Sequence, residues 1–142
     1  MGGMQPEGDL PSGCCFLSSL LYGCLLYTSA LRRETAGRPL FLLCGMLEDK
    51  HPQKALLPVF SLENLKYAAC VPVNSPRSAD PECLCALFQA NGVSGGAYRS
   101  CAEALDSLLR LSGTGGTVAC FGSLYLAADI RRYFGKTLPN SL

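Results

Sequence analysis

The sequence predicts an α/β fold, a Rossmann-like and mostly parallel sheet flanked by helices and incomplete at its N-terminal side. Four short apolar runs alternate with amphipathic helical segments, which is the order of βα units joined by right-handed crossovers. The run over residues 40–44 is apolar throughout, as in strands covered on both faces. The run over residues 117–121 stops at a Gly-Ser pair and leads directly into a helical pattern.

The first predicted elements lie between residues 30 and 60. Residues 30–34 are interpreted as the end of a helix that Gly37 terminates, and strand 40–44 follows. A helix is then expected over residues 52–60. Its apolar side is expected to contain Leu56, Leu57 and Phe60.

A second strand and its helix are expected over residues 67–73 and 80–91. The strand is rich in apolar residues and is followed by an Asn-Ser-Pro turn. Asp80 is a suitable N-cap for the helix, with Pro81 at the first helical position. Gly92 then ends this helix.

The last two units follow the same order. Residues 96–100 are expected to form a short third strand, and Ser100 with Glu103 three residues later gives a capping-box pattern for the next helix. The fourth strand is the run over residues 117–121. The helix after it has apolar residues at helical spacing.

Length and composition narrow the possible functions. The chain has 142 residues, 49% of them hydrophobic and 16% charged, with a formal net charge of +1. This is the composition of one folded domain and not of a disordered tail. No basic stripe suggests nucleic acid. His51 is the only histidine, which excludes a His-based triad or a multi-His metal site within the chain.

Nine cysteines are present, an odd number with no C-x-x-C pair. The closest approach is Cys83-x-Cys85, on a predicted helix. Three others lie in predicted strands, where cysteine acts as a small hydrophobe. We therefore expect structural thiols in a reducing compartment, and a disulfide or metal framework is the less favoured alternative.

Residues 1–29 differ from the rest and are expected to be a foreign or disordered extension. Residues 1–13 are rich in glycine and proline. The apolar stretch over residues 16–27 is shorter than the about 20 residues of a membrane helix, and acidic residues before it are atypical of a signal peptide. Residues 24–29 match the translation of a transposon end used in sequencing libraries; the alternative is an ordinary short apolar helix. A cytoplasmic protein without membrane contact is expected.

The Gly-Ser pair after the last strand is the first candidate site. Gly122 permits a tight turn or a close backbone approach, and Ser123 can cap the following helix. Free backbone N–H groups at the carboxyl edge of an open α/β sheet commonly face ligands. Ser123 is therefore either a ligand-binding residue or a plain helix cap.

Charged residues after the first two strands are further candidates. Asp49 and Lys50 follow strand 40–44, so Lys50 could meet a carboxylate or phosphate, and Asp49 could hold Lys50 or cap a helix. Arg77 follows the second strand and could bind such an anion bidentately. The alternatives are a solvated turn and an exposed loop arginine. His51 is interpreted as a helix-start residue.

Three blocks of the sequence, in order, resemble one known family. A strand with G-S-L-Y-L and a helix with paired arginines occupies residues 117–134, and a strand with G-M-L-E-D-K occupies residues 39–50. Weaker similarity lies at residues 76–79 and 102–105. Over about residues 30–136 the chain resembles the C-terminal domain of the folylpolyglutamate synthase and dihydrofolate synthase family, within the Mur ligase superfamily. Residues 137–142 would be a tail.

The resemblance implies a part of an ATP-dependent ligase that adds glutamate to folate or dihydropteroate through an acyl phosphate. In that family this domain closes over ATP and forms part of the glutamate pocket, while ATP and Mg²⁺ are bound mainly by the larger N-terminal domain. The chain contains neither a P-loop nor the family's D-x-A-H-N-P motif. The resemblance therefore implies a monomeric fragment, inactive alone, without catalytic or metal-binding residues of its own. Its candidate binding residues are Gly122, Ser123, Asp49, Lys50 and Arg77.

Two alternatives remain at this point. One is a different Mur-type ligase that uses another amino acid. The other is a non-catalytic α/β binding module. A pocket around Ser123 that differs from that of the resembled family would favour the other Mur-type ligase. Failure to bind nucleotide or glutamate would favour the binding module.

Overall fold

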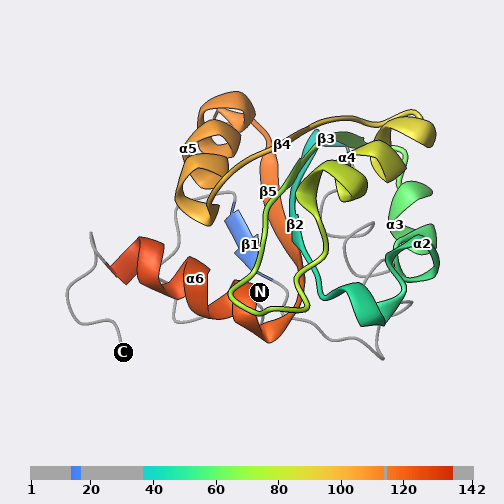
Figure 1. The fold of residues 1–142 in the computed structure, drawn as a ribbon. Coiled ribbons are helices and arrows are strands. Elements are labelled where there is room, and N and C mark those ends of the chain that lie inside the picture. The colour runs from blue at the N-terminus through green and yellow to red at the C-terminus, as the bar shows by residue number, and fades with distance from the viewer. Residues whose placement is uncertain (1–13, 17–36, 114, 136–142) are drawn as a thin grey trace.

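The computed structural model describes residues 14–16, 37–113 and 115–135 (Figure 1). They form a five-stranded sheet of order β1-β5-β2-β3-β4 in which every neighbouring pair is parallel. The α/β prediction is therefore confirmed. The strands are β1 Cys14–Phe16, β2 Leu40–Gly45, β3 Leu65–Cys70, β4 Ser94–Ala97 and β5 Thr117–Gly122.

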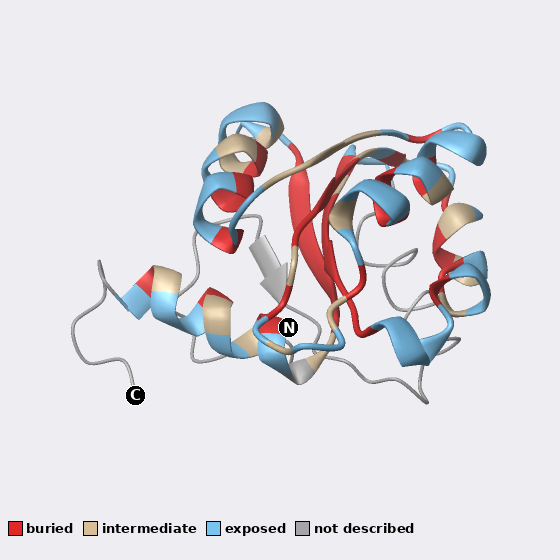
Figure 2. Ribbon diagram, viewed as in Figure 1, coloured by how far each residue is buried: buried red, intermediate tan, exposed pale blue. Residues whose placement is uncertain are grey.

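Helices cover both faces of the sheet (Figure 1). One face carries α2 Pro52–Ala55, α3 Leu57–Phe60 and α4 Pro81–Ala90, preceded by the 3₁₀ turn η3 Glu48–Lys50. The other carries α5 Cys101–Ser112 and α6 Leu124–Gly135. Strand β5 is buried along its whole length, as Figure 2 shows for the centre of the sheet. The continuous apolar runs in the sequence reflect this burial on both faces.

Strand β1 was not predicted, because it lies in the segment interpreted as an extension. Its backbone pairs in parallel with β5, with Cys14 opposite Val118 and Phe16 opposite Cys120. The boundary placed at residue 29 stays a prediction. The expected helix end at residues 30–34 and the tail at 137–142 lie outside the described residues.

The helix predicted over residues 52–60 is two short helices that meet at Leu56. Pro58 has no N–H and cannot continue the hydrogen-bond ladder, so the chain restarts as α3. Leu56 and Val59 are fully buried, whereas Leu57 is 59% exposed. The prediction that Leu57 shares the apolar side was therefore wrong.

Two predicted strands are displaced along the sequence. β3 begins two residues before the predicted 67–73 and ends at Cys70, although the Val71 amide still donates to the Cys44 carbonyl at 3.0 Å. β4 begins at Ser94 and not at residue 96. In both cases the register with the neighbouring strand sets the ends, and local composition does not record that register.

Both predicted helix caps are present. The Asp80 carboxylate accepts from the Glu82 amide at 3.0 Å, and the Ser100 hydroxyl accepts from the Glu103 amide at 3.2 Å. The Glu103 carboxylate accepts from the amide of Arg99, one residue before the position of a standard capping box, at 3.3 Å. These bonds satisfy amides that helix starts otherwise leave unpaired.

Cysteines in the described core are buried free thiols: Cys44, Cys70, Cys85, Cys101 and Cys120. Burial raises the pKa of Cys70 to about 12 and that of Cys101 to about 12. The pKa of an unfolded cysteine thiol is about 8.5. The folded state therefore holds more protons than the unfolded state between these values, so stability is lost as pH rises through this range.

We expect the urea midpoint to fall steadily between about pH 9 and pH 11, with Cys70 and Cys101 contributing. Equilibrium unfolding across that range measures the slope. A Cys101→Ala variant should show a shallower slope than the parent chain. An identical slope in both would contradict the assignment to this thiol.

Thr117, at the start of β5, carries an uncompensated polar atom. The residue is 2% exposed, and its hydroxyl is buried without a hydrogen-bond partner in the part of the chain that the structure describes. Thr117→Val keeps the shape and removes the buried hydroxyl, so it should raise the free energy of unfolding by about 1 kcal/mol. Urea denaturation measures this gain. Thr117→Ser, which keeps the hydroxyl and loses the methyl group, should instead destabilise the chain.

Candidate functional site

The order of the strands creates a switch point between β2 and β5. The chain runs from β2 to β3 and β4 on one side and then returns to place β5 on the other side of β2. The segments that leave these strands diverge, since η3 and α2 go to one face and α6 to the other (Figure 1). Open α/β sheets bind ligands outside the carboxyl ends of the strands at such a point.

We call the carboxyl ends of these two strands, with Gly45, Met46, Gly122 and Ser123, the β2–β5 edge. Gly45 and Gly122 are paired in register across the two strands. A Cβ added to Gly122 would overlap the carbonyl oxygen of Gly45 and would lie 2.9 Å from its carbonyl carbon. Gly122 also has φ +146°, which L side chains rarely adopt. The close approach therefore requires glycine at residue 122, as the sequence predicted.

Ser123 is held at this edge by its backbone. Its amide donates to the Gly45 carbonyl at 3.0 Å, and its carbonyl accepts from the amides of Leu126 and Ala127 at 3.0 and 3.3 Å. Its hydroxyl oxygen is buried and has no hydrogen-bond partner within the described residues. The side chain therefore makes no capping bond there, and a buried hydroxyl without a partner is a group that a ligand can satisfy.

The two roles of Ser123 make opposite predictions for Ser123→Ala. Loss of a helix cap costs about 1 kcal/mol. Because the hydroxyl makes no such bond, we expect the free energy of unfolding to change by less than about 0.5 kcal/mol, or to rise slightly. Urea denaturation of the two chains measures the difference, and a loss of a full cap's energy would contradict the geometry.

Two of the charged candidate residues, Asp49 and Arg77, lie next to each other. Asp49 forms an ion pair with Arg77, and both side chains are about half exposed. The loops that carry them are joined by backbone bonds, from the Glu48 amide to the Arg77 carbonyl at 2.7 Å and from the Ala79 amide to the Met46 carbonyl at 2.8 Å. Asp49 therefore holds Arg77 and not Lys50, and the pair joins two loops that border the β2–β5 edge.

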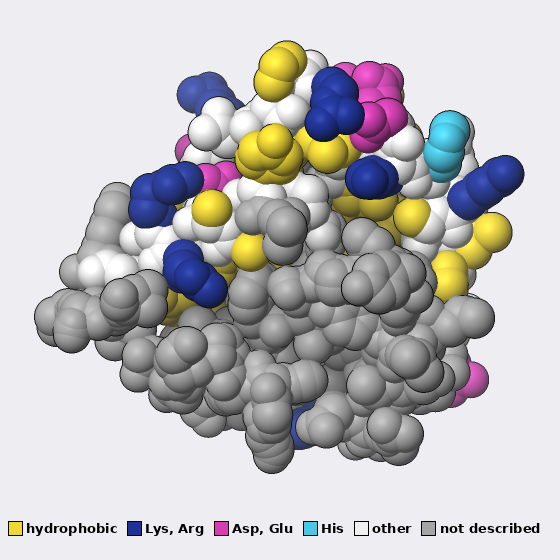
Figure 3. All heavy atoms as spheres, turned by 90° about the horizontal axis from the view of Figure 1, so that it is seen from below, with side chains coloured by type: hydrophobic (Ala, Val, Ile, Leu, Met, Phe, Trp, Pro, Cys, Tyr) yellow, Lys and Arg dark blue, Asp and Glu magenta, His cyan; other side chains and the backbone are white. Residues whose placement is uncertain are grey.

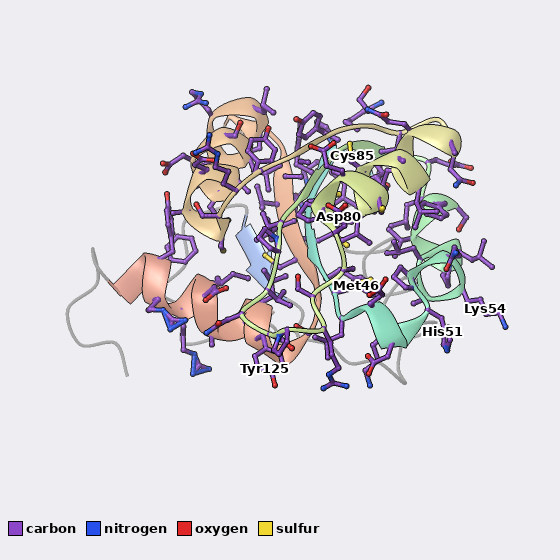
Figure 4. The ribbon with its side chains drawn as sticks, viewed as in Figure 1. Met46, His51, Lys54, Asp80, Cys85 and Tyr125 are labelled. Carbon is purple, nitrogen blue, oxygen red and sulfur yellow. The ribbon has the colours of Figure 1, made fainter. Side chains whose placement is uncertain are left out.

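Lys50 and His51 follow Asp49 in the segment after β2, and both are exposed. His51 precedes α2, and its carbonyl accepts from the amides of Lys54 and Ala55 at 3.0 Å each, so its prediction as a helix-start residue is confirmed. It has φ 53°, an uncommon conformation for a residue other than glycine. In Figure 4 the His51 and Lys54 side chains point outward from the sheet.

Tyr125 is a residue that the sequence reasoning missed. It lies in the first turn of α6, is 43% exposed, and projects from the carboxyl edge in Figure 4. The available signal was an aromatic residue two positions after the Gly-Ser turn. On the visible part of this edge basic side chains are interspersed with acidic ones, with the single histidine at the rim (Figure 3).

No helix among the described residues is long and apolar enough to cross a membrane. No group of three or more His, Cys, Asp or Glu side chains among them could hold a metal ion.

Comparisons with known proteins identify the fold. No protein-family profile and no curated protein sequence matches the chain. E. coli FolC in complex with DHPP and ADP matches with a TM-score of 0.79 at 19% identity, over 92% of this chain and 31% of that chain.

Two further solved structures agree with this match. Mycobacterium tuberculosis folylpolyglutamate synthase, solved with ADP and AMPPCP, matches with a TM-score of 0.72 at 18% identity, over 85% of this chain and 30% of that chain. Thermotoga maritima folylpolyglutamate synthase matches with a TM-score of 0.70 at 21% identity, over 90% and 29%.

The chain thus spans about a third of the length of the solved structures that it matches. At these sequence identities the structural similarity shows the fold alone. This fold agrees with the family resemblance of the three sequence blocks. The chain has the fold of one portion, about a third, of the folylpolyglutamate synthases.

Proposed function

We propose that this chain is the C-terminal-domain portion of an ATP-dependent ligase that adds glutamate to folate or dihydropteroate. The observation that carries the proposal is the match along 92% of the chain to FolC, a protein solved with DHPP and ADP. The three ordered sequence blocks support the same family. With this assignment we expect the protein to be monomeric and cytoplasmic and to act in folate metabolism.

The residues of the β2–β5 edge suit an anionic ligand. The amides of Leu124 and Tyr125 lie in the first turn of α6, where amides have no acceptor within the helix, and the Ser123 hydroxyl lacks a partner among the described residues. Lys50 adds a positive charge near the same edge. These groups would contact a phosphate of ATP or a carboxylate of glutamate.

We propose a nucleotide as a ligand of this edge and expect the metal to be bound elsewhere. Bound ATP supplies the phosphoryl group that activates the substrate carboxylate. The described residues offer no cluster of ligands for Mg²⁺, so the metal would be held by another part of the parent enzyme. The role left to this chain is to close over the nucleotide, exclude water from the activated carboxylate, and orient the incoming glutamate.

We expect no ligase turnover from the chain alone. It contains no G-x-x-x-x-G-K-[ST] loop to hold the phosphates of a nucleotide. Ligand binding is therefore the proper test of this proposal.

Thermal unfolding of the chain with ADP, with L-glutamate and with both provides that test. A ligand at 100 times its dissociation constant adds about 2.7 kcal/mol to the free energy of unfolding. Ser123→Ala should reduce the ligand-induced shift while leaving the unliganded midpoint nearly unchanged. Ser61→Ala, at an exposed serine after α3, is the control; it removes the bond from the Ser61 hydroxyl to the Pro58 carbonyl, so its unliganded midpoint can fall, but its ligand-induced shift should equal that of the parent chain.

The outcomes separate the candidate functions. A shift with another amino acid in place of glutamate would identify a different Mur-type ligase. No shift with either nucleotide or glutamate would overturn the proposal and favour a non-catalytic module.

A further inference from the structure

A hollow lies between α5 and α6, and none of the residues that define the β2–β5 edge lines it. It has a volume of about 350 Å³ and is lined by the segment after β3, the start of α5 and one side of α6. Neither Gly122 nor Ser123 lines it. We call it the α5–α6 hollow. The lining residues used below are Asn74, Arg99, Cys101, Asp129, Arg132 and Tyr133.

Two arginines from separate elements line this hollow. Arg99 precedes α5, and Arg132 lies on the third turn of α6. Among the described residues Asp129 is the only carboxylate in the lining, and Arg132 Nη2 donates to its Oδ1 at 2.7 Å. A guanidinium has five N–H donors, so Arg132 keeps most of its donors after this bond. The lining therefore carries an excess of positive charge and of hydrogen-bond donors.

The walls of the hollow are built from fixed parts. The Arg99 amide donates to the Glu103 carboxylate at 3.3 Å, which fixes the backbone before α5. The Tyr133 hydroxyl donates to Asp106 at 2.6 Å and ties α6 to α5. Neither bond involves the guanidinium group of Arg99 or Arg132. The placement of α6 against the start of α5 thus has support that does not involve the side chains of Arg99 and Arg132.

The remaining wall is uncharged. Pro72, Val73 and Cys101 contribute apolar surface. Burial raises the pKa of the Cys101 thiol to about 12, so this group is a neutral thiol at physiological pH. Asn74 adds a side-chain amide. An anionic group in the hollow would thus meet two arginines and Asp129, while the carboxylates of Glu103 and Asp106 bond the Arg99 amide and the Tyr133 hydroxyl and do not line the hollow.

We propose that the α5–α6 hollow binds the phosphate group of a small molecule. A tetrahedral phosphate dianion can present separate oxygen edges to two guanidinium groups that come from different elements. The volume of the hollow is at the lower end of the range for ligand pockets, which favours a small phosphate ester over a polymer. This site is independent of the ligase assignment, because none of the residues that define the β2–β5 edge lines the hollow.

The test is a titration of the full chain with inorganic phosphate at low ionic strength, followed by ¹⁵N–¹H NMR. We expect the largest shifts at the amides of Asn74, Cys101 and Ala102 and at the side-chain Nε groups of Arg99 and Arg132. Arg99→Gln and Arg132→Gln should each weaken the affinity about tenfold. Arg99→Lys, which keeps the charge and loses the planar fork, should give an intermediate loss.

Arg110→Gln is the matched control, since Arg110 is exposed in the last turn of α5 and does not line the hollow. It should leave the affinity unchanged. The same spectra show that each variant is folded. An equal loss in Arg110→Gln would indicate diffuse attraction and overturn the proposal. So would the absence of localised shifts, or tighter binding of glutarate than of phosphate, which would assign the hollow to a carboxylate.

Discussion

Gly122→Ala should lower the free energy of unfolding by about 3–5 kcal/mol. The added Cβ would overlap the carbonyl oxygen of Gly45 on the neighbouring strand. The Cβ is fixed directly to the backbone of β5 and the carbonyl belongs to the backbone of β2, so the clash cannot be relieved by rotation of a side chain. The φ of +146° adds strain for any residue with a Cβ.

Urea denaturation of the parent and variant chains measures this loss. Gly135→Ala is the matched control, because a Cβ at that residue of α6 meets no atom within 4 Å and alanine favours helix. It should be neutral or slightly stabilising. A cost below about 1 kcal/mol for Gly122→Ala would show that β2 and β5 do not approach closely at this edge. Because the same contact positions Ser123, the variant should also lose the ligand-induced shift in the thermal midpoint.

The second large effect is expected at two adjacent leucines. Leu56→Ala should cost about 3 kcal/mol, since Leu56 is 0% exposed and its removal leaves a cavity beneath α2 and α3. Leu57→Ala should cost less than about 0.5 kcal/mol, since Leu57 is 59% exposed. The two substitutions remove the same atoms from neighbouring residues.

Their difference in free energy of unfolding, measured by urea denaturation under one set of conditions, tests the break between the two helices. One continuous helix would place Leu56, Leu57 and Phe60 on a common apolar side, and both substitutions would then be costly. Similar losses at the two leucines would therefore contradict the structure.

The features that could be predicted from the sequence are those determined by local chemistry. The apolar runs of β2 and β5 and the Asp80 and Ser100 caps depend on residues close together in the chain. Burial on both faces removes polar residues from such strands, and helix starts need side-chain acceptors. The α/β class and the position of Ser123 at a carboxyl edge follow from the same local patterns.

The features that could not be predicted depend on contacts between distant segments. Asp49 pairs with Arg77 only because the loops after β2 and β3 lie side by side. The parallel pairing of β1 with β5 joins segments about a hundred residues apart, and nothing in three residues of β1 encodes that partner. Arg99 and Arg132 share a hollow because α5 and α6 pack on the same face.

By itself, then, the sequence determined the fold class, the order of the main elements and the Asp80 and Ser100 caps. Each of these rests on local preferences of short stretches of the chain that agree with the global fold. The tertiary structure alone decided which charges are paired, whether Leu56 or Leu57 is buried, and that the Ser123 hydroxyl is buried without a partner in the described chain. The reason is that packing sets solvent access and charge pairing, and both depend on atoms far away in the sequence.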